Sequence, residues 1–289
     1  MSTTRSASSI GLAASERKRL AANLNLVVQD SNYCLESKGI TFMINHQNSL
    51  FPHAEIDPAW ASGDYSITLS RKFGAPMHRF SAEIMQEFRH TVTHLTRAQE
   101  LPKRVSIVSA LREEGVTHTA LALGATAARD LERNVCVVDL NWWWPSKTWN
   151  EVQQLSPGVS FILQENATVD EALVRTGSPF LKLLPAGHSS PSQRPVMARG
   201  SALKSLLDEL DERFDHIILD VPAILATSDS IPLASLGSNC CLVIQQGVSA
   251  KSNTAQALDE ISHLSVLGVV MNRVHLSTPN WLLKWIPQE

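Results

Sequence analysis

The sequence lacks any long apolar run. Nothing approaches the roughly 18 consecutive apolar residues that a membrane-spanning helix requires, and residues 1–30 contain no apolar signal core. Cysteine is also scarce, with four residues in 289 and no C-x-x-C spacing, which argues against a disulfide framework. The net charge of -3 gives no electrostatic case for a nucleic-acid partner. We therefore expect a cytoplasmic globular protein that binds no nucleic acid.

The segment around residue 110 has the frame of a phosphate-binding loop. An apolar strand is predicted at residues 105–108, followed by a polar turn and a helix that opens near Thr117. Ala110 is separated by four residues from Gly115, and Thr117 follows one residue later, which fits a loose version of the motif. The lysine of that motif is replaced by Val116. The sequence thus predicts a phosphate loop without its main cation.

Apolar segments alternate with helical segments along the rest of the chain. Continuous apolar strands of this kind predict an α/β fold in three layers, a mostly parallel sheet with helices on both faces. Ligands of such sheets bind at the carboxyl ends of the strands. The residues predicted at these ends are those from Ser109 to Thr117, then Asp139, Asp220 and Asn272.

Three regions are expected along the chain. Residues 1–78 are poorly periodic and are interpreted as a partly ordered arm, with a short helix at residues 14–28. Residues 79–276 form the predicted α/β domain, which begins with an amphipathic helix at residues 81–97. Residues 277–289 form an amphipathic tail in which Trp281 and Trp285 share one helical face.

The order of the motifs resembles that of the polysaccharide-associated bacterial tyrosine autokinases, a branch of the MinD/ParA-like P-loop ATPases. The matching segments are Ser109-Ala-Leu-Arg-Glu-Glu-Gly-Val-Thr-His-Thr-Ala120, Asp139-Leu-Asn-Trp-Trp-Trp-Pro145, Pro185-Ala-Gly187, Ile217-Ile-Leu-Asp220-Val-Pro-Ala223 and Gly268-Val-Val-Met-Asn272-Arg273. The resemblance covers roughly residues 80–275 and implies a P-loop NTPase-like domain.

The resemblance also assigns roles to single residues. It implies that Asp139 and Asp220 organise Mg²⁺ together with Thr117, and that Asn272 contacts adenine. The nucleotide phosphates would lie against the loop residues Glu114, Gly115, Val116, Thr117 and His118. If any nucleotide binding is retained, the cofactors are ATP and Mg²⁺.

Several positions depart from the family pattern. Val116 replaces the phosphate-binding lysine, and Glu113 replaces a loop glycine. Asn141 stands where the family has an aspartate, and an amide cannot act as a general base. The tyrosine-rich tail of the family is missing, because the two tyrosines are Tyr33 and Tyr65. We therefore expect Asp139, Asn141 and Asp220 to be vestiges of a catalytic centre.

The departures favour a non-catalytic protein that needs no cofactor. The expected role is a scaffold or regulator of exopolysaccharide or capsule synthesis and export. Two alternatives stay open: an active, divergent ATPase or tyrosine autokinase, and a MinD/ParA-like positioning protein.

Interface residues are expected in three places. On the helix at residues 81–97 the resemblance implies a ring contact between subunits, but Gln86 and Val92 replace its outer charges and only Arg89 persists. The ring should therefore be disfavoured. The run from Trp142 through Trp143 to Trp144 is interpreted as a partner contact, with core packing as the alternative.

The tail is the third place. Its patch of Trp281 and Trp285 would pack on the domain, bind a protein partner, or make a weak contact with a membrane surface. The partners implied by the resemblance are a membrane-anchored polysaccharide copolymerase or a related kinase-like subunit. The protein would then be peripheral at the inner face of the plasma membrane.

Overall fold

The computed structural model describes residues 24–29, 32–37, 40–45, 66–69, 76–98 and 101–274. Strands β1 (Leu24–Gln29) and β2 (Asn32–Ser37) pair antiparallel. The helix expected at residues 14–28 is therefore wrong for residues 24–28, because β1 covers them. Strand β3 (Ile40–Asn45) joins the main sheet beside its last strand. The sheet therefore extends into the segment that the sequence analysis treats as an arm, and the boundary at residue 79 stays a prediction.

The central sheet has eight strands in the order β3-β12-β11-β6-β10-β7-β9-β8. All neighbours in it pair parallel except the two-residue edge strand β8 (Val174–Arg175), which runs antiparallel to β9. The other strands are β6 (Arg104–Ser109), β7 (Val135–Asp139), β9 (Leu181–Leu184), β10 (His216–Asp220), β11 (Asn239–Gln245) and β12 (Ser265–Val274). The predicted mostly parallel α/β sheet is confirmed.

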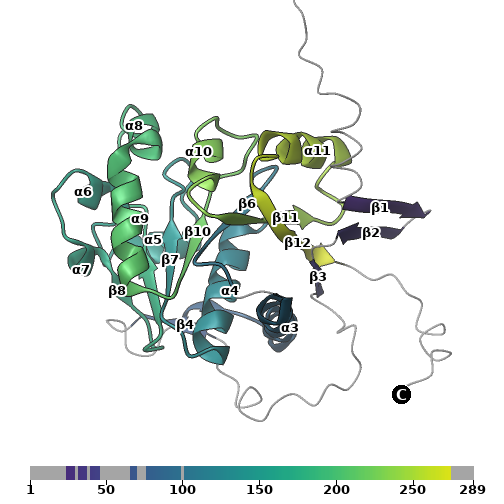
Figure 1. Cartoon of the computed structure of the whole chain (residues 1–289). Helices are drawn as coiled ribbons and strands as arrows, with labels where there is room; N and C mark the ends of the chain where they lie inside the picture. Colours follow the sequence, from purple (N-terminus) through teal and green to yellow (C-terminus); the bar gives the residue numbers. More distant parts are fainter. Residues whose placement is uncertain are drawn as a thin grey trace, which may run out of the picture.

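Helices cover both faces of this sheet (Figure 1). On one face lie α3 (Ala82–Ala98), α4 (Val116–Asp130) and α5 (Lys147–Gln153), whose apolar side chains join one buried cluster with Val105, Ile107 and Val137. On the other, a second cluster around Val108, Cys136 and Leu219 is completed by six helices. These are α6 (Val159–Leu163), α7 (Val169–Ala172), α8 (Arg194–Arg199), α9 (Ser201–Arg213), α10 (Ser230–Ala234) and α11 (Lys251–Glu260).

Burial on both faces explains why the strands are apolar throughout. Strand β6 has Val105 to Ser109 buried, and it lies between β11 and β10 in the middle of the sheet. Side chains that alternate between the two faces therefore all need to be small or apolar. This central position places the end of β6, where the loop begins, among the ends of four other parallel strands.

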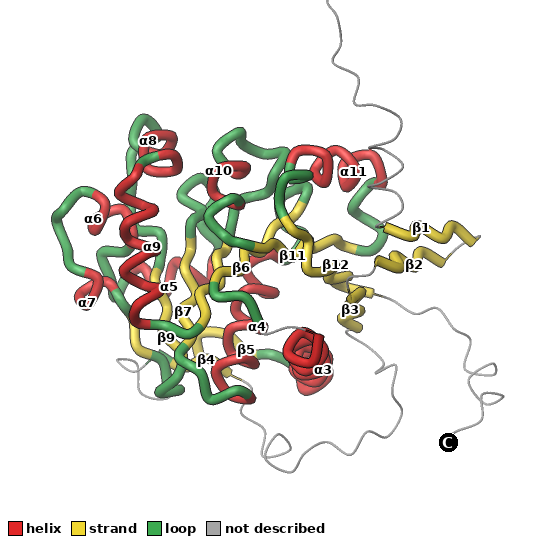
Figure 2. Tube along the Cα trace, in the orientation of Figure 1, coloured by secondary structure: helices red, strands yellow, loops and turns green. Residues whose placement is uncertain are grey.

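A separate hairpin flanks the edge of the sheet. It consists of β4 (Ser66–Thr68) and β5 (Pro76–Arg79), which pair antiparallel. Leu69 forms a bridge with Thr176 just after β8. Figure 2 shows the hairpin beside α4, on the side of the molecule away from α11. None of the helices in the described ranges combines the length and the apolar character that a membrane span needs.

Candidate functional site

The loop between β6 and α4 keeps a phosphate-loop backbone although its sequence departs from the motif. Gly115 has a φ of 106° and immediately precedes α4. Glu113 has a φ of 68°, a left-handed conformation that costs a non-glycine residue roughly 1 kcal/mol. The surrounding structure therefore imposes a loop shape that glycine would adopt more easily at residue 113.

Glu114 occupies the interior of this loop. Its side chain is fully buried, and Oε2 accepts a hydrogen bond from the backbone N–H of Leu111 at 2.8 Å. Oε1 accepts a hydrogen bond from the hydroxyl of Ser249, which follows β11. The carbonyl of Glu114 accepts one from Nδ2 of Asn272 on β12 at 2.9 Å. The side chain of Glu114 thus ties the loop to the segment after β11, and its carbonyl ties the loop to β12.

Val116 carries no charge to replace the missing lysine. It is the first residue of α4, and its half-buried side chain packs against the apolar cluster beneath α3 and α4. The loop therefore offers a bound phosphate the dipole of α4 but no ammonium group at this position.

Two carboxylates lie beside the loop, at the ends of neighbouring strands. Asp139 on β7 and Asp220 on β10 are register partners, and both are buried. Oδ1 of Asp139 accepts a hydrogen bond from the backbone N–H of Asn141 at 2.8 Å. Its Oδ2 makes no hydrogen bond of good geometry within the described part of the chain, although the backbone N–H of Ala186 lies close enough to Asp139 to oppose the rise of its pKa. Asp220 accepts hydrogen bonds from the hydroxyl of Thr117 and from Nε1 of Trp149, the latter at 2.7 Å.

Burial shifts the pKa values of both carboxyl groups. Loss of hydration raises the pKa of Asp220 to about 6, against the effect of the hydrogen bonds from Thr117 and Trp149. The pKa of Asp139 is raised well above its ordinary value, first by burial and then by the negative charge of Asp220. Two adjacent buried carboxylates repel each other, so the pair retains a proton at mildly acidic pH.

Trp149 is the site residue that the sequence analysis missed. It lies on α5, which begins after Ser146, whose hydroxyl accepts a hydrogen bond from the Trp149 N–H at 3.2 Å. The side chain is 1% exposed and its indole N–H reaches Asp220 from a position 71 residues away in sequence. Nothing in the sequence pairs this indole with that carboxylate.

Asn141 and the three tryptophans form a turn after β7. The Asn141 side chain bonds both backbone groups of Trp144, accepting from its N–H and donating to its carbonyl, each at 3.1 Å. Trp142 is 2% exposed and donates from Nε1 to the carbonyl of Ala186 at 2.7 Å. A partner contact through Trp142 is therefore wrong, because this indole belongs to the core.

Trp143 and Trp144 are only partly buried. The ring of Trp143 lies edge-on to that of Trp142, with the centroids 5.9 Å apart. The guanidinium of Arg112, from the loop, lies 4.6 Å from the ring centroid of Trp144. A cation in this position is attracted by the face of the indole. The interface role of Trp143 and Trp144 stays a prediction.

The remaining predicted site residues lie apart from the carboxylate pair. His118 on α4 contacts β5, with its Nδ1 2.9 Å from Nε2 of His78. Asn272 is buried with its Nδ2 bonded to the loop, while its Oδ1 has no partner in the part of the chain described. Gln86 and Arg89 lie on α3, and Arg89 forms an ion pair with Asp130 at 3.2 Å. Trp281 and Trp285 lie outside the described residues.

The site suits a magnesium ion better than a nucleotide. The Oδ2 of Asp139 and the Thr117 hydroxyl beside Asp220 are oxygen donors of the kind that Mg²⁺ prefers. The phosphate half lacks the lysine of the motif, because Val116 brings no positive charge.

Comparison with known sequences identifies tyrosine kinases of bacteria as relatives. No family model matches the chain. Tyrosine-protein kinase YwqD of Bacillus subtilis is 26% identical over 177 residues, which cover 61% of this chain and 74% of that protein. Tyrosine-protein kinase ptk of Acinetobacter johnsonii is 22% identical over 194 residues, 66% of this chain but 26% of that protein. Tyrosine-protein kinase CpsD of Streptococcus agalactiae is 25% identical over 126 residues, 43% of this chain and 55% of that protein.

Solved structures share the fold. The chimerical protein CapA2B2 superposes with a TM-score of 0.65 at 18% identity, covering 90% of this chain and 99% of that one. The kinase domain of the Escherichia coli tyrosine kinase ETK gives 0.62 at 16% identity, covering 84% and 94%. The BceF tyrosine kinase domain gives 0.61 at 18% identity, covering 89% and 98%. The resemblance found in the motifs and the P-loop NTPase-like fold are both confirmed.

Proposed function

We propose that this chain is a tyrosine-autokinase-like protein that has lost kinase activity and acts as a scaffold or regulator in exopolysaccharide or capsule synthesis. The kinase relatives and the shared fold support the general area of function. The proposed loss of activity rests on one observation: the position of the loop lysine holds Val116, whose half-buried side chain packs against the apolar cluster. A loop without the lysine at this position should stabilise ATP and the transition state of phosphoryl transfer poorly.

The proposed partner is a membrane-anchored polysaccharide copolymerase or a related kinase-like chain. The structural neighbour CapA2B2 is by its name a chimera of two components, which supports a partner of this kind. Trp143, Trp144 and the α3 surface around Gln86 and Arg89 are the surfaces proposed for it. Binding to such a partner would hold the protein at the inner face of the plasma membrane.

A divergent ATPase is the second candidate, and a specific observation favours it. Thr117 still hydrogen-bonds Asp220, and Oδ2 of Asp139 makes no hydrogen bond of good geometry within the described residues, so the cation half of the site is retained. The loop also keeps the left-handed residues 113 and 115. In this alternative MgATP binds although the loop lysine is lost, and Arg112 is the nearest loop residue with a positive charge.

One experiment separates the two candidates. The purified protein is incubated with labelled MgATP, and bound nucleotide, released phosphate and phosphotyrosine are measured separately. We expect a Kd poorer than millimolar, no hydrolysis and no phosphotyrosine. Micromolar binding together with hydrolysis that is lost in Asp220→Ala would establish the ATPase instead.

A further inference from the structure

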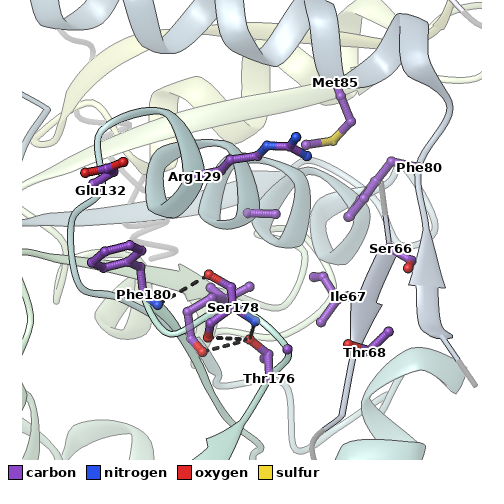
Figure 3. Close-up of a pocket in the computed structure, with 13 residues that line it drawn as sticks. Ser66, Ile67, Thr68, Phe80, Met85, Arg129, Glu132, Thr176, Ser178 and Phe180 are labelled. Atoms are coloured by element: carbon purple, nitrogen blue, oxygen red, sulfur yellow. Dashed lines mark hydrogen bonds between the residues drawn. The ribbon is translucent and has the colours of Figure 1, made fainter. Parts of the chain in front are cut away.

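A cavity lies toward the end of α4 that is remote from the phosphate loop. Its volume is about 380 Å³, within the range of roughly 300–1,000 Å³ that is usual for small-molecule sites. The walls come from the hairpin β4–β5, the start of α3, the end of α4 and the turn before β9 (Figure 3). None of the predicted nucleotide or magnesium residues lines it.

The cavity has a mixed lining, in which apolar and aromatic side chains lie beside the hydroxyl groups of Ser66, Thr68, Thr176 and Ser178. Ile67 and Phe80 lie on the hairpin side, Met85 on α3, and Phe180 on the opposite wall (Figure 3). Ala125 forms the helical wall, and its small side chain leaves the space open. Two hydrogen bonds hold the turn before β9. The Thr176 hydroxyl donates to the carbonyl of Leu181 at 2.9 Å, and Ser178 Oγ accepts from the Phe180 N–H at 3.3 Å. These bonds fix the shape of that wall.

One positive charge lies over the cavity. The Arg129 side chain extends from α4 toward Met85, whereas Glu132 lies beyond the end of the helix (Figure 3). A guanidinium has five N–H donors and binds a carboxylate in a bidentate manner, so it can accept an anionic ligand in addition to its other contacts. The chemistry that fits is a flat apolar body between Phe80 and Phe180 with an anionic group at Arg129.

We propose that this cavity is a ligand site for a small aromatic carboxylate. The site is built from a different edge of the sheet and is independent of whether the phosphate loop binds nucleotide. The ligand's ring fills the space between Phe80, Met85 and Phe180, and its carboxylate pairs with Arg129.

The same cavity contacts the phosphate-loop helix through Phe80. The ring of Phe80, which lines the cavity, lies 5.3 Å from the ring of His118 on the first turn of α4 and 4.7 Å from that of His78. His78 and His118 are themselves joined at 2.9 Å. A ligand that moves Phe80 would therefore change the packing of His118, so the His118 ring reports on occupation of the cavity.

Titration with indole-3-acetate tests the proposal, with indole as the analogue that lacks the carboxylate. We expect saturable binding of indole-3-acetate, tighter than that of indole, together with shifts of the His78 and His118 ring signals in the NMR spectrum. Arg129→Gln should weaken indole-3-acetate roughly tenfold or more, as expected for a lost hydrogen bond to a charged group, and leave indole unchanged. The matched control is Arg133→Gln, an exposed arginine outside the cavity, which should bind as the wild type does.

Cavity filling provides the second arm of the test. Ala125→Leu should abolish binding of both compounds, and thermal unfolding will verify that the variant is folded. Should it fail to fold, Phe180→Ala replaces it, since this half-buried wall residue is tolerant of truncation and its loss should also weaken both compounds. Absence of saturable binding to the wild type, or affinity for indole-3-acetate that is unchanged in Arg129→Gln and in the folded wall variant, would overturn the proposal.

Discussion

Asp139 and Asp220 are register partners on adjacent parallel strands, and the negative charge of Asp220 raises the pKa of Asp139. In an active P-loop enzyme such a carboxylate pair is balanced by a metal ion and by the loop lysine. Here the lysine position holds Val116, whose side chain faces the core. The repulsion between the two carboxylates is thus part of the folded state of this protein, and it has measurable consequences.

The first prediction concerns stability against pH. The folded-state pKa of Asp220 is raised from 3.8 to about 6, so its contribution to stability is present below pH 4 and is lost as the pH rises through 6. The pKa of Asp139 shifts in the same direction. Asp139→Asn should therefore raise the free energy of unfolding at pH 7.5 by about 1–3 kcal/mol, with a smaller gain at pH 4. Urea unfolding at several pH values measures this, and exposed Asp259→Asn is the control that should not change the slope.

The second prediction restores the missing cation. Val116→Lys should improve the affinity for MgATP by about ten- to a hundredfold, because a hydrogen bond to a charged group contributes roughly 1.5–3 kcal/mol. Isothermal titration calorimetry measures the change. Val116→Met adds similar bulk without charge and should bind as poorly as the wild type does. Equal gains in MgATP affinity in both variants would show that the size of the side chain at position 116, and not its charge, limits the affinity.

The third prediction concerns the left-handed residue of the loop. Glu113 has a φ of 68°, so Glu113→Gly should relieve strain and stabilise the protein by about 0.5–1 kcal/mol after the entropy cost of glycine. Glu113→Ala keeps the steric penalty and should give no gain. Thermal unfolding of the two variants distinguishes strain from the loss of the carboxylate.

The fourth prediction concerns Trp149. Trp149→Phe removes the indole N–H that bonds Asp220 and should destabilise the protein by about 2–3 kcal/mol. The pKa of Asp220 should rise further, so the loss should be larger at pH 8 than at pH 5. Trp142→Phe removes a donor to the neutral carbonyl of Ala186 and is the matched control, whose effect should not vary with pH.

The fifth prediction concerns assembly. The ion pair between Arg89 and Asp130 is formed within one chain, so it gives no reason for a second copy to bind there. We expect a monomer or small oligomer at micromolar concentration by light scattering, and no change in size for Arg89→Ala. A stable ring that Arg89→Ala dissolves would contradict this prediction.

The sequence predicted the frame of the fold well, because its signals are local. The strand expected at residues 105–108 and the helix expected at residues 81–97 are single continuous patterns, and the structure has them as Arg104–Ser109 and Ala82–Ala98. The contacts that decide the chemistry are not local. Glu114 meets Ser249 across 135 residues, and Trp149 meets Asp220 across 71, and no periodicity encodes either pair.

The tryptophan run illustrates the same limit. Three adjacent aromatic residues suggested an exposed patch, yet Trp142 is buried because the turn held by Asn141 directs it toward Ala186. Strand β3 was also missed, since its place beside β12 depends on pairing with the far end of the chain. Pairing of this kind is decided by the assembled sheet and not by the strand's own sequence.

The carboxylate of Glu114 ties the loop to Ser249 after β11, while its backbone carbonyl is tied to Asn272 on β12. Glu114 is thus a shared anchor, and a movement of its carboxylate breaks the bonds to the Leu111 N–H and to Ser249 together. Opening of the loop should therefore be cooperative with movement of the segment after β11, although the ends of β6 and β11 lie far apart in the sequence.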